Sequence, residues 1–201
     1  MVAVIDYDAG NIRSVEKAVE ALDKQVVVTR SPEEILNADH VILPGVGAFG
    51  DAMEKLHKYD LAGVIREVTV KKTPFLGICL GLQLLFDSSE ESEGVDGLGI
   101  LPGRIVRIPE EKELKIPHIG WNSLSYPNQG RLFQGIPEQS YVYFVHSYYL
   151  RAENAEIVKA TTEYGVLIHA SVEKDNIFAC QFHPEKSSET GMRILKNFLD
   201  I

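Results

Sequence analysis

Hydrophobic positions in the first half of the chain alternate between two spacings. Short apolar runs of the strand type occupy four places: Val2–Tyr7, Gln25–Thr29, His40–Leu43 and Pro74–Ile78. Apolar residues at helical spacing occupy the stretches that follow them: Asn11–Leu22, a segment capped by Ser31 with Pro32 at its first position, Asp51–Lys58, Leu61–Val70 and Leu80–Asp87. Strands that alternate with helices predict right-handed crossovers and an α/β fold with a mostly parallel central sheet and flanking helices.

The second half of the chain has a different pattern, with many strands and few helices. Strand-like runs are found at Arg104–Ile108, Tyr141–Val145, Glu156–Thr161, Val166–Val172 and Ile177–Phe182. A final helical pattern covers Ser188–Leu199. We therefore expect antiparallel strands to be added to the sheet in the C-terminal half. No linker, repeat or low-complexity segment interrupts the pattern, which predicts a single domain over residues 1–201.

Composition limits the classes of function. The 201 residues are 45% hydrophobic and 24% charged, as in a globular domain, and no apolar run is long enough for a membrane span. The first apolar stretch has no basic segment before it, so no secretory leader is expected. A net charge of −9 argues against nucleic acid as a partner. Two cysteines are too few for a disulfide framework, which favours a cytoplasmic location, although a Cys79–Cys180 bond stays possible at this point.

Cys79 lies in the arrangement expected of a nucleophile. The spacing G-x-C-x-G places Gly77 and Gly81 around Cys79, between a buried strand and an apolar helix. This is a nucleophile elbow with cysteine in place of serine, in which the turn is too tight for flanking side chains. The positive end of the helix favours the thiolate, and the N–H of Leu80 is free to bind an oxyanion.

The alternative is a small buried cysteine that fills a turn, because free cysteines are commonly buried. Cys180 provides the contrast within the chain. It lies in the run IFACQF, where no glycine opens the backbone, and we predict a core position for it. The two glycines around Cys79 favour the catalytic interpretation there.

A cysteine nucleophile needs a histidine base and a group that orients the base. His183 follows the strand-like run Ile177–Phe182, at the sheet edge where α/β enzymes place their sites. Pro184 stiffens the turn, and Glu185 is close enough to hold one tautomer of the imidazole. We predict Cys79, His183 and Glu185 as the catalytic residues. A surface turn is the alternative for the His-Pro-Glu segment alone.

The other histidines carry weaker signals. His40 and His57 fall at the ends of predicted elements, where we expect surface positions, and His169 lies within a strand, where we expect a structural role. His118 and His146 are expected in aromatic-rich loops, and the pattern leaves their roles open.

A glycine-rich loop follows the strand His40–Leu43. Its G-x-G-x-x-G spacing is typical of dinucleotide-binding loops, but it does not follow the first strand, and the next strand ends without the expected acidic residue. Backbone N–H groups of such a loop also bind a developing negative charge. Given the elbow, we interpret Gly45, Val46 and Gly47, together with Leu80, as an oxyanion hole.

These motifs carry a resemblance over essentially the whole chain. The segments PGVGAFG, GICLGLQLLF and QFHPEKS resemble the oxyanion, nucleophile and histidine motifs of class I, triad-type glutamine amidotransferases, in the expected order. Within that family, DYDAGNIRSV, PHIGWN, YFVHSYY and HPEKSS are most similar to the glutaminase subunits of imidazole glycerol phosphate synthases. The one difference is Leu82, where methionine is common.

The resemblance implies glutamine hydrolysis through a cysteinyl thioester, without a metal or other cofactor. It places four residues around the glutamine: Gln83, Glu91, Ser147 and Tyr148. The physical reasoning agrees for two of them, because Gln83 lies one turn after Cys79 and the Glu91 carboxylate suits an α-ammonium group. Ordinary solvated or capping roles are the alternative. The resemblance also implies weak activity without a partner, and an oxyanion loop that can rest with one peptide turned away.

A partner also follows from the resemblance: a (β/α)8 cyclase subunit in a heterodimer. It would use the ammonia to form imidazole glycerol phosphate and an aminoimidazole carboxamide ribonucleotide in histidine biosynthesis. Five residues are similar to interface or gate positions of that family: His118, Trp121, Asn122, Tyr143 and Lys186. Aromatic and cationic side chains suit such a face, although Trp121 is equally compatible with a core position.

Three other functions stay open from the sequence. The chain could serve a different synthase, such as those that form anthranilate, pyridoxal phosphate or guanylate. It could be a binding module without activity, which the intact triad disfavours. It could also be a cysteine peptidase or another amide hydrolase on the same architecture, which the predicted glutamine contacts disfavour.

Overall fold

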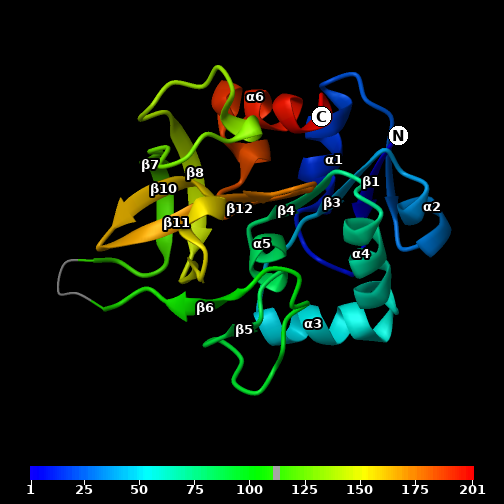
Figure 1. Ribbon diagram of the computed structural model, residues 1–201, viewed down its shortest axis with the longest axis horizontal. Helices are drawn as coiled ribbons and strands as arrows, with labels where there is room; N and C mark the ends of the chain where they lie inside the picture. Colours follow the sequence, from blue (N-terminus) through cyan, green and yellow to red (C-terminus); the bar gives the residue numbers. More distant parts are fainter. Residues whose placement is uncertain (111–113) are drawn as a thin grey trace.

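The computed structural model describes residues 1–110 and 114–201 and is built around a seven-stranded sheet (Figure 1). The strand order is β10-β11-β12-β4-β3-β1-β2. The strand bounds, in that order, are Val158–Tyr164, Val166–Lys174, Ile177–Cys180, Phe75–Ile78, His40–Leu43, Val2–Ile5 and Val26–Thr29. All pairings from β12 to β2 are parallel, whereas β10, β11 and β12 pair antiparallel. The predicted α/β fold with antiparallel additions is thus confirmed.

Helices cover both faces of this sheet (Figure 1). One face carries α1 and α6, and the other carries α3, α4 and α5. The helix bounds are Ile12–Glu20 for α1, Pro32–Leu36 for α2, Phe49–Lys58 for α3, Leu61–Val70 for α4, Leu80–Leu84 for α5 and Ser188–Leu199 for α6. Short 3-10 turns lie at Arg131–Phe133, Ala155–Ile157 and Pro184–Lys186.

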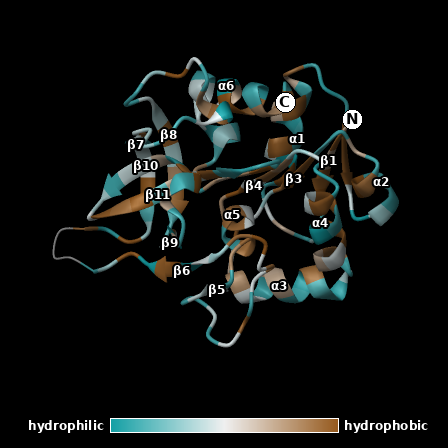
Figure 2. Cartoon of the chain, viewed as in Figure 1, coloured by the Kyte–Doolittle hydropathy of each residue, from teal (hydrophilic) through white to brown (hydrophobic). Residues whose placement is uncertain are grey.

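The central strands are buried on both faces, which explains their continuous apolar runs (Figure 2). In β1, Val2 and Val4 pack with α1 and α6, and Ala3 and Ile5 pack with the helices of the opposite face. Alternate side chains along each strand therefore contribute to two separate hydrophobic clusters. This double burial holds the carboxyl ends of β1, β3, β4 and β12 at one edge of the sheet.

Two smaller sheets extend the fold from this edge. One contains β5 (Ser88–Ser89), β6 (Gly103–Arg107) and β9 (Tyr148–Ala152), and the other is the antiparallel pair β7 (His118–Ser123) and β8 (Tyr141–His146). The pattern did not predict β5, β7 or β9. Polar and glycine residues interrupt β7, and its pairing with β8 crosses a long stretch of sequence, so local periodicity is a weak signal there.

The first helix, predicted over Asn11–Leu22, is shorter at both ends, at Ile12–Glu20. The bounds of α3 and α5 also differ from the predictions, and hydrogen bonds explain these two differences. The third helix begins at Phe49 and not at Asp51, because the N–H groups of Phe49 and Gly50 donate to Glu91 and Ser92 of a distant loop, at 2.8 and 3.0 Å. The fifth helix ends at Leu84 and not at Asp87. There the loop at residues 98–101 donates to the carbonyls that would continue the helix. Within the described residues, no helix has the length and apolar character needed to cross a membrane.

Candidate active site

Cys79 occupies a tight turn between β4 and α5. Its backbone lies at φ 54° and ψ −108°, and its side chain is buried at 6% exposure. A Cβ on Gly77 would lie 2.7 Å from the carbonyl oxygen of Gly81, and a Cβ on Gly81 would lie 1.9 Å from that of Leu43. Both flanking positions therefore require glycine, in agreement with the elbow expected from the sequence.

His183 and Glu185 meet beyond the end of β12. Glu185 Oε1 lies 2.8 Å from His183 Nδ1, and both side chains are buried. The backbone N–H of His183 donates to the Tyr143 carbonyl at 2.9 Å. Ser187 Oγ accepts from Tyr143 N at 2.9 Å and donates to the His183 carbonyl at 2.6 Å. The neighbouring strand β8 thereby fixes the position of the histidine.

His183 is held as a cation at neutral pH. Burial lowers its pKa, but the nearby Cys79 and the hydrogen bond with Glu185 outweigh this and raise the pKa from 6.5 to about 9. Nε2 of His183, the nitrogen not used by Glu185, is buried without a hydrogen-bond partner within the described residues. The imidazolium can therefore give a proton from this nitrogen to a group bound beside Cys79.

Asn11 contacts the predicted catalytic residue Glu185, which the sequence analysis did not anticipate. Its side-chain Nδ2 donates to Glu185 Oε1, the oxygen that also contacts His183. Asn11 precedes α1 in a left-handed conformation, at φ 70°. The sequence did contain a signal that Asn11 lies near the site. The segment DYDAGN follows β1, and the carboxyl end of β1 lies at the same edge of the sheet as Cys79.

The glycine-rich loop rests against the elbow. The N–H of Leu80, expected to bind an oxyanion, donates to the Gly45 carbonyl at 3.3 Å. Tyr7 Oη donates to the Pro44 carbonyl at 2.9 Å, and a Cβ on Gly45 would lie 2.3 Å from Tyr7 Oη. The Leu80 N–H is therefore already paired with the Gly45 carbonyl.

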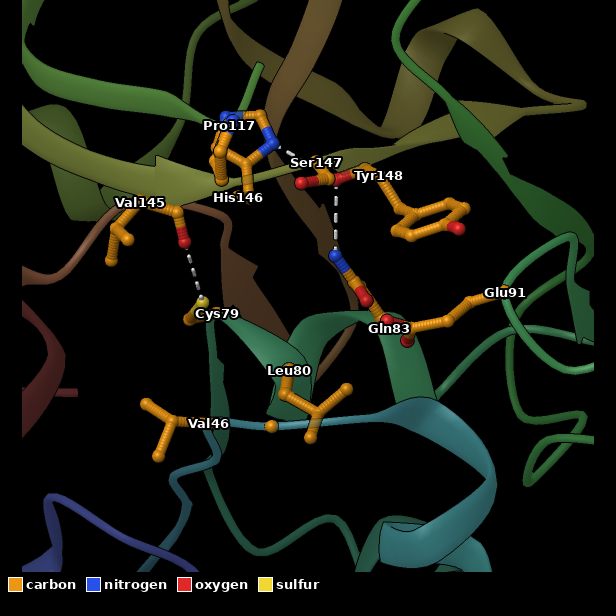
Figure 3. Close-up of a pocket in the computed structure, with 11 residues that line it drawn as sticks. Val46, Cys79, Leu80, Gln83, Glu91, Pro117, Val145, His146, Ser147 and Tyr148 are labelled. Atoms are coloured by element: carbon orange, nitrogen blue, oxygen red, sulfur yellow. Dashed lines mark hydrogen bonds between the residues drawn. The ribbon is translucent and has the colours of Figure 1, made fainter.

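A cavity of about 270 Å³ opens above Cys79 (Figure 3). It brings together Cys79, three residues predicted to form an oxyanion hole, and all four residues expected around glutamine. Its lining among the described residues is Val46, Gly47, Cys79, Leu80, Gln83, Glu91, Pro117, Val145, His146, Ser147 and Tyr148. We call residues 145–148 the substrate wall. His183 lies behind the cysteine and does not line the cavity.

Two of the predicted glutamine contacts already have hydrogen bonds. Gln83 Nε2 donates to the Tyr148 carbonyl at 3.1 Å and to Gln181 Oε1 at 3.0 Å, so its amide braces the substrate wall (Figure 3). Glu91 Oε2 accepts from Phe49 N at 2.8 Å at the start of α3. Glu91 also lines the cavity, and no residue in the described ranges donates to its Oε1.

The expected interface residues separate into two groups. Trp121 is 51% exposed and forms a cross-strand pair with Tyr143, with ring centroids 6.1 Å apart; Asn122 is half-buried and Lys186 is exposed. His118 differs from the expectation, because it is 2% exposed. In the alternation of β7 it points to the inner side, whereas Trp121 points to the outer side.

The remaining thiol and histidines are placed as follows. Cys79 and Cys180 are both free thiols, so they form no disulfide, and Cys180 is fully buried as predicted. His57 is exposed as predicted. His40, expected at the surface, is half-buried against Phe198, and burial lowers its pKa. His169 accepts from Ala152 N at 3.2 Å, in agreement with a structural role.

Known proteins resemble this chain over its whole length. The protein called "Imidazole glycerol phosphate synthase subunit HisH" of Moorella thermoacetica is 52% identical over 197 residues, covering 98% of this chain and 93% of the relative. The protein of the same name from Methanocaldococcus jannaschii is 48% identical over 201 residues, covering 100% of both.

Solved structures agree on the fold. One described as "Crystal structure of glutamine amidotransferase" superposes with a TM-score of 0.77 at 19% identity, covering 100% of this chain and 98% of the other. The glutaminase domain of Trypanosoma brucei CTPS superposes with a TM-score of 0.70 at 16% identity, covering 99% and 93%. The family model "Glutamine amidotransferase class-I" matches residues 3–201. The chain belongs to the class I glutamine amidotransferase family.

Proposed function

We propose that this chain is the glutaminase subunit of an imidazole glycerol phosphate synthase, acting as a single domain over residues 1–201 in the cytoplasm. The observation that carries the proposal is the cavity whose floor is the Cys79 thiol, with His183 and Glu185 behind it. Relatives about half identical to this chain bear the name of that subunit, which supports the choice of synthase.

The proposed reaction begins at Cys79. Its thiolate attacks the side-chain amide carbon of glutamine and forms a tetrahedral oxyanion. His183 gives its proton to the leaving nitrogen, so ammonia departs and a glutamyl thioester remains on Sγ. Water then attacks the thioester while His183 accepts a proton, which releases glutamate and restores the thiolate. Glu185 stabilises the imidazolium throughout, and its contact with His183 at 2.8 Å supports this role.

The oxyanion is proposed to bind the Leu80 N–H together with N–H groups of Gly45, Val46 and Gly47. In this structure the Leu80 N–H already donates to the Gly45 carbonyl, at 3.3 Å. A peptide of this loop must therefore rotate before the oxyanion can be stabilised fully. This supports low activity of the subunit alone and higher activity when a partner favours the rotated loop.

The proposed partner is a (β/α)8 cyclase that receives the ammonia and uses it on a phosphoribulosyl-formimino aminoimidazole ribonucleotide. Trp121, Tyr143, Asn122 and Lys186 are the residues proposed to contact it. The exposed outer side of β7 and β8 supports this for Trp121 and Tyr143, because Ile119, Trp121 and Tyr141 are 58%, 51% and 58% exposed there. Val145 belongs to the same strand and lines the cavity, so this face continues toward Cys79.

Activity with and without the cyclase tests the proposal. Glutamine hydrolysis is measured for the wild type alone, with the cyclase subunit, and with the cyclase plus its nucleotide ligand. Strong stimulation by the complete mixture is expected. High activity that is indifferent to the cyclase contradicts the assignment to this synthase and points to another amidotransferase. Cleavage of peptides or other amides in preference to glutamine points to a different amide hydrolase.

A second experiment tests the glutamine contacts. Glu91→Gln keeps an acceptor for the Phe49 N–H but removes the charge proposed to bind the α-ammonium group of glutamine. The KM for glutamine is expected to rise about tenfold or more, because a charge-assisted contact is lost. Glu93→Gln, at an exposed position of the same loop, is the control. An unchanged KM in Glu91→Gln would remove Glu91 from the substrate site.

A further inference from the structure

A chain of hydrogen bonds passes through two buried histidines, one of which, His146, belongs to the substrate wall. His118 and His146 are directly opposed on β7 and β8, and His118 Nδ1 lies 3.0 Å from His146 Nε2. His146 Nδ1 lies 2.9 Å from the Tyr148 carbonyl. At the other end, Asn122 Nδ2 lies 3.4 Å from His118 Nε2. The chain connects β7 to the wall of the cavity.

The chemistry of its two ends sets the direction of this chain. A carbonyl oxygen only accepts, so His146 Nδ1 must carry a proton. In a neutral ring Nε2 is then an acceptor, and His118 Nδ1 must donate to it. His118 Nε2 is in turn an acceptor that faces the Asn122 amide. Asn122 is itself oriented, because Nδ2 also donates to the Glu163 carbonyl at 2.9 Å and Oδ1 accepts from Ser123 N at 2.8 Å.

The surroundings of the two rings favour this neutral arrangement. His118 lies between the rings of Phe144 and Tyr164, with centroid distances of 4.8 and 3.9 Å and near-parallel planes. His118 is 2% exposed and His146 is 6% exposed. Burial lowers the pKa of His118 to about 4 and that of His146 to about 3, and the nearby His118 and His183 also lower the latter. Both rings are thus uncharged at neutral pH.

The chain ends on a carbonyl that belongs to the substrate wall. The Tyr148 oxygen accepts from His146 Nδ1 and from Gln83 Nε2, so both of its lone pairs are used (Figure 3). His146 itself lines the cavity. Resting on the function proposed above, we infer that His118 and His146 are positioning residues, which fix the 146–148 backbone in the shape that receives glutamine.

The protonation of the rings tests the first part of the inference in the unmodified protein. Imidazole ¹⁵N chemical shifts at pH 7 are expected to show a proton on Nδ1 and none on Nε2 for both His118 and His146. A proton on Nε2 of either ring overturns the directed chain. This result does not depend on activity, so it decides the hydrogen-bond chain even if the proposed function fails.

Kinetics test the second part, with glutaminase activity measured in the complex with the cyclase and its ligand. His118→Phe keeps an aromatic ring between Phe144 and Tyr164 but removes the donor to His146. The KM for glutamine is expected to rise about tenfold, with kcat within about twofold, because the lost hydrogen bond supports binding and does not contact Cys79 or His183. His118→Asn returns a donor near the Nδ1 position and is expected to recover most of the loss.

The remaining outcomes distinguish positioning from simple packing. His57→Phe, at an exposed histidine of α3, is the matched control and is expected to keep the wild-type KM. A KM that stays at the wild-type value in His118→Phe contradicts the inference. So does a fall in kcat with unchanged KM, or a failure of His118→Asn to improve on His118→Phe. If His118→Phe does not fold, the Nδ1 protonation and the KM of His118→Asn, expected near that of the wild type, still decide the matter.

Discussion

Two regions border the cavity, the proposed catalytic side around Cys79 and His183 and the proposed substrate side around His118 and His146, and their histidines are in opposite charge states. On the catalytic side, Cys79 and Glu185 raise the pKa of His183 to about 9. On the substrate side, burial lowers the pKa of His118 to about 4 and that of His146 to about 3. In the proposed function, the charged ring is the one that transfers a proton, and the uncharged rings are those that hold the backbone in a fixed shape.

The two cysteines also differ in their proposed roles, and replacing them gives the largest expected difference in activity. Cys79→Ala should reduce glutamine hydrolysis about ten-thousandfold or more, because it removes the proposed nucleophile. Cys180→Ala is the control. Cys180 ends the strand next to that of Cys79 but is fully buried, so its activity per folded molecule should stay near that of the wild type. Equal losses in both variants would show that packing, and not nucleophilicity, is being measured.

The elbow on the catalytic side tolerates less change than the rest of the fold. Gly81→Ala should lower the free energy of unfolding by about 3 kcal/mol, because its Cβ would lie 1.9 Å from the Leu43 carbonyl oxygen. Gly63→Ala adds the same group at an exposed position in the middle of α4. Apart from the adjacent backbone of α4, no heavy atom of the described residues lies within 4 Å of the added Cβ. It should stabilise the protein by about 0.5–1 kcal/mol. Urea unfolding of both variants checks this; a Gly81→Ala variant as stable as the wild type would disprove the tight turn.

Replacing Asn11 tests whether the proposed catalytic side affects kcat and not KM. Asn11→Gly permits the left-handed backbone but removes the amide that donates to Glu185. We expect kcat to fall about tenfold with KM little changed, since Glu185 then holds His183 less firmly. This is the reverse of the effect expected for His118→Phe. The control is Asn37→Gly, at an exposed position after α2. A rise in KM alone would place Asn11 on the substrate side.

The opposite charge states also predict the dependence of stability on pH. The raised pKa of His183 gives stability that is complete below 6.5 and is lost as pH rises toward about 9. The lowered pKa values of His118 and His146 give stability that is complete above 6.5 and is lost as pH falls toward about 4. From these three groups, the free energy of unfolding should have its maximum near pH 6.5. His183→Gln should flatten the alkaline decline, and His118→Phe should flatten part of the acid decline.

The two sides also differ in how far the sequence predicts them. The elbow around Cys79 is local, because two glycines, a strand and a helix determine it within a few residues. The His-Pro-Glu turn is local for the same reason. The substrate side is assembled across long separations: Gln83 bonds to Tyr148, and His118 pairs with His146 on strands that the periodicity did not reveal. A local pattern therefore predicts the candidate catalytic residues, and only the folded chain shows why His118 is buried.

The same limit applies to Asn11 and to the start of α3. Asn11 reaches Glu185 across 174 positions of sequence, and Glu91 caps α3 across 42 positions. Neither contact leaves a periodic signal near the residue itself. By contrast, a mostly parallel sheet with flanking helices follows from the alternation of strands and helices along the chain, so the α/β core was predictable.

Covalent labelling of the cavity tests the central claim, that Cys79 is the nucleophile of a glutamine site. The protein is treated with an electrophilic glutamine analogue, and its peptides are analysed by mass spectrometry. One adduct is expected, on the peptide that contains Cys79, and an excess of glutamine should prevent it. The Cys79→Ala variant should carry no adduct. Labelling of Cys180, or labelling of Cys79 that glutamine does not slow, would contradict the account.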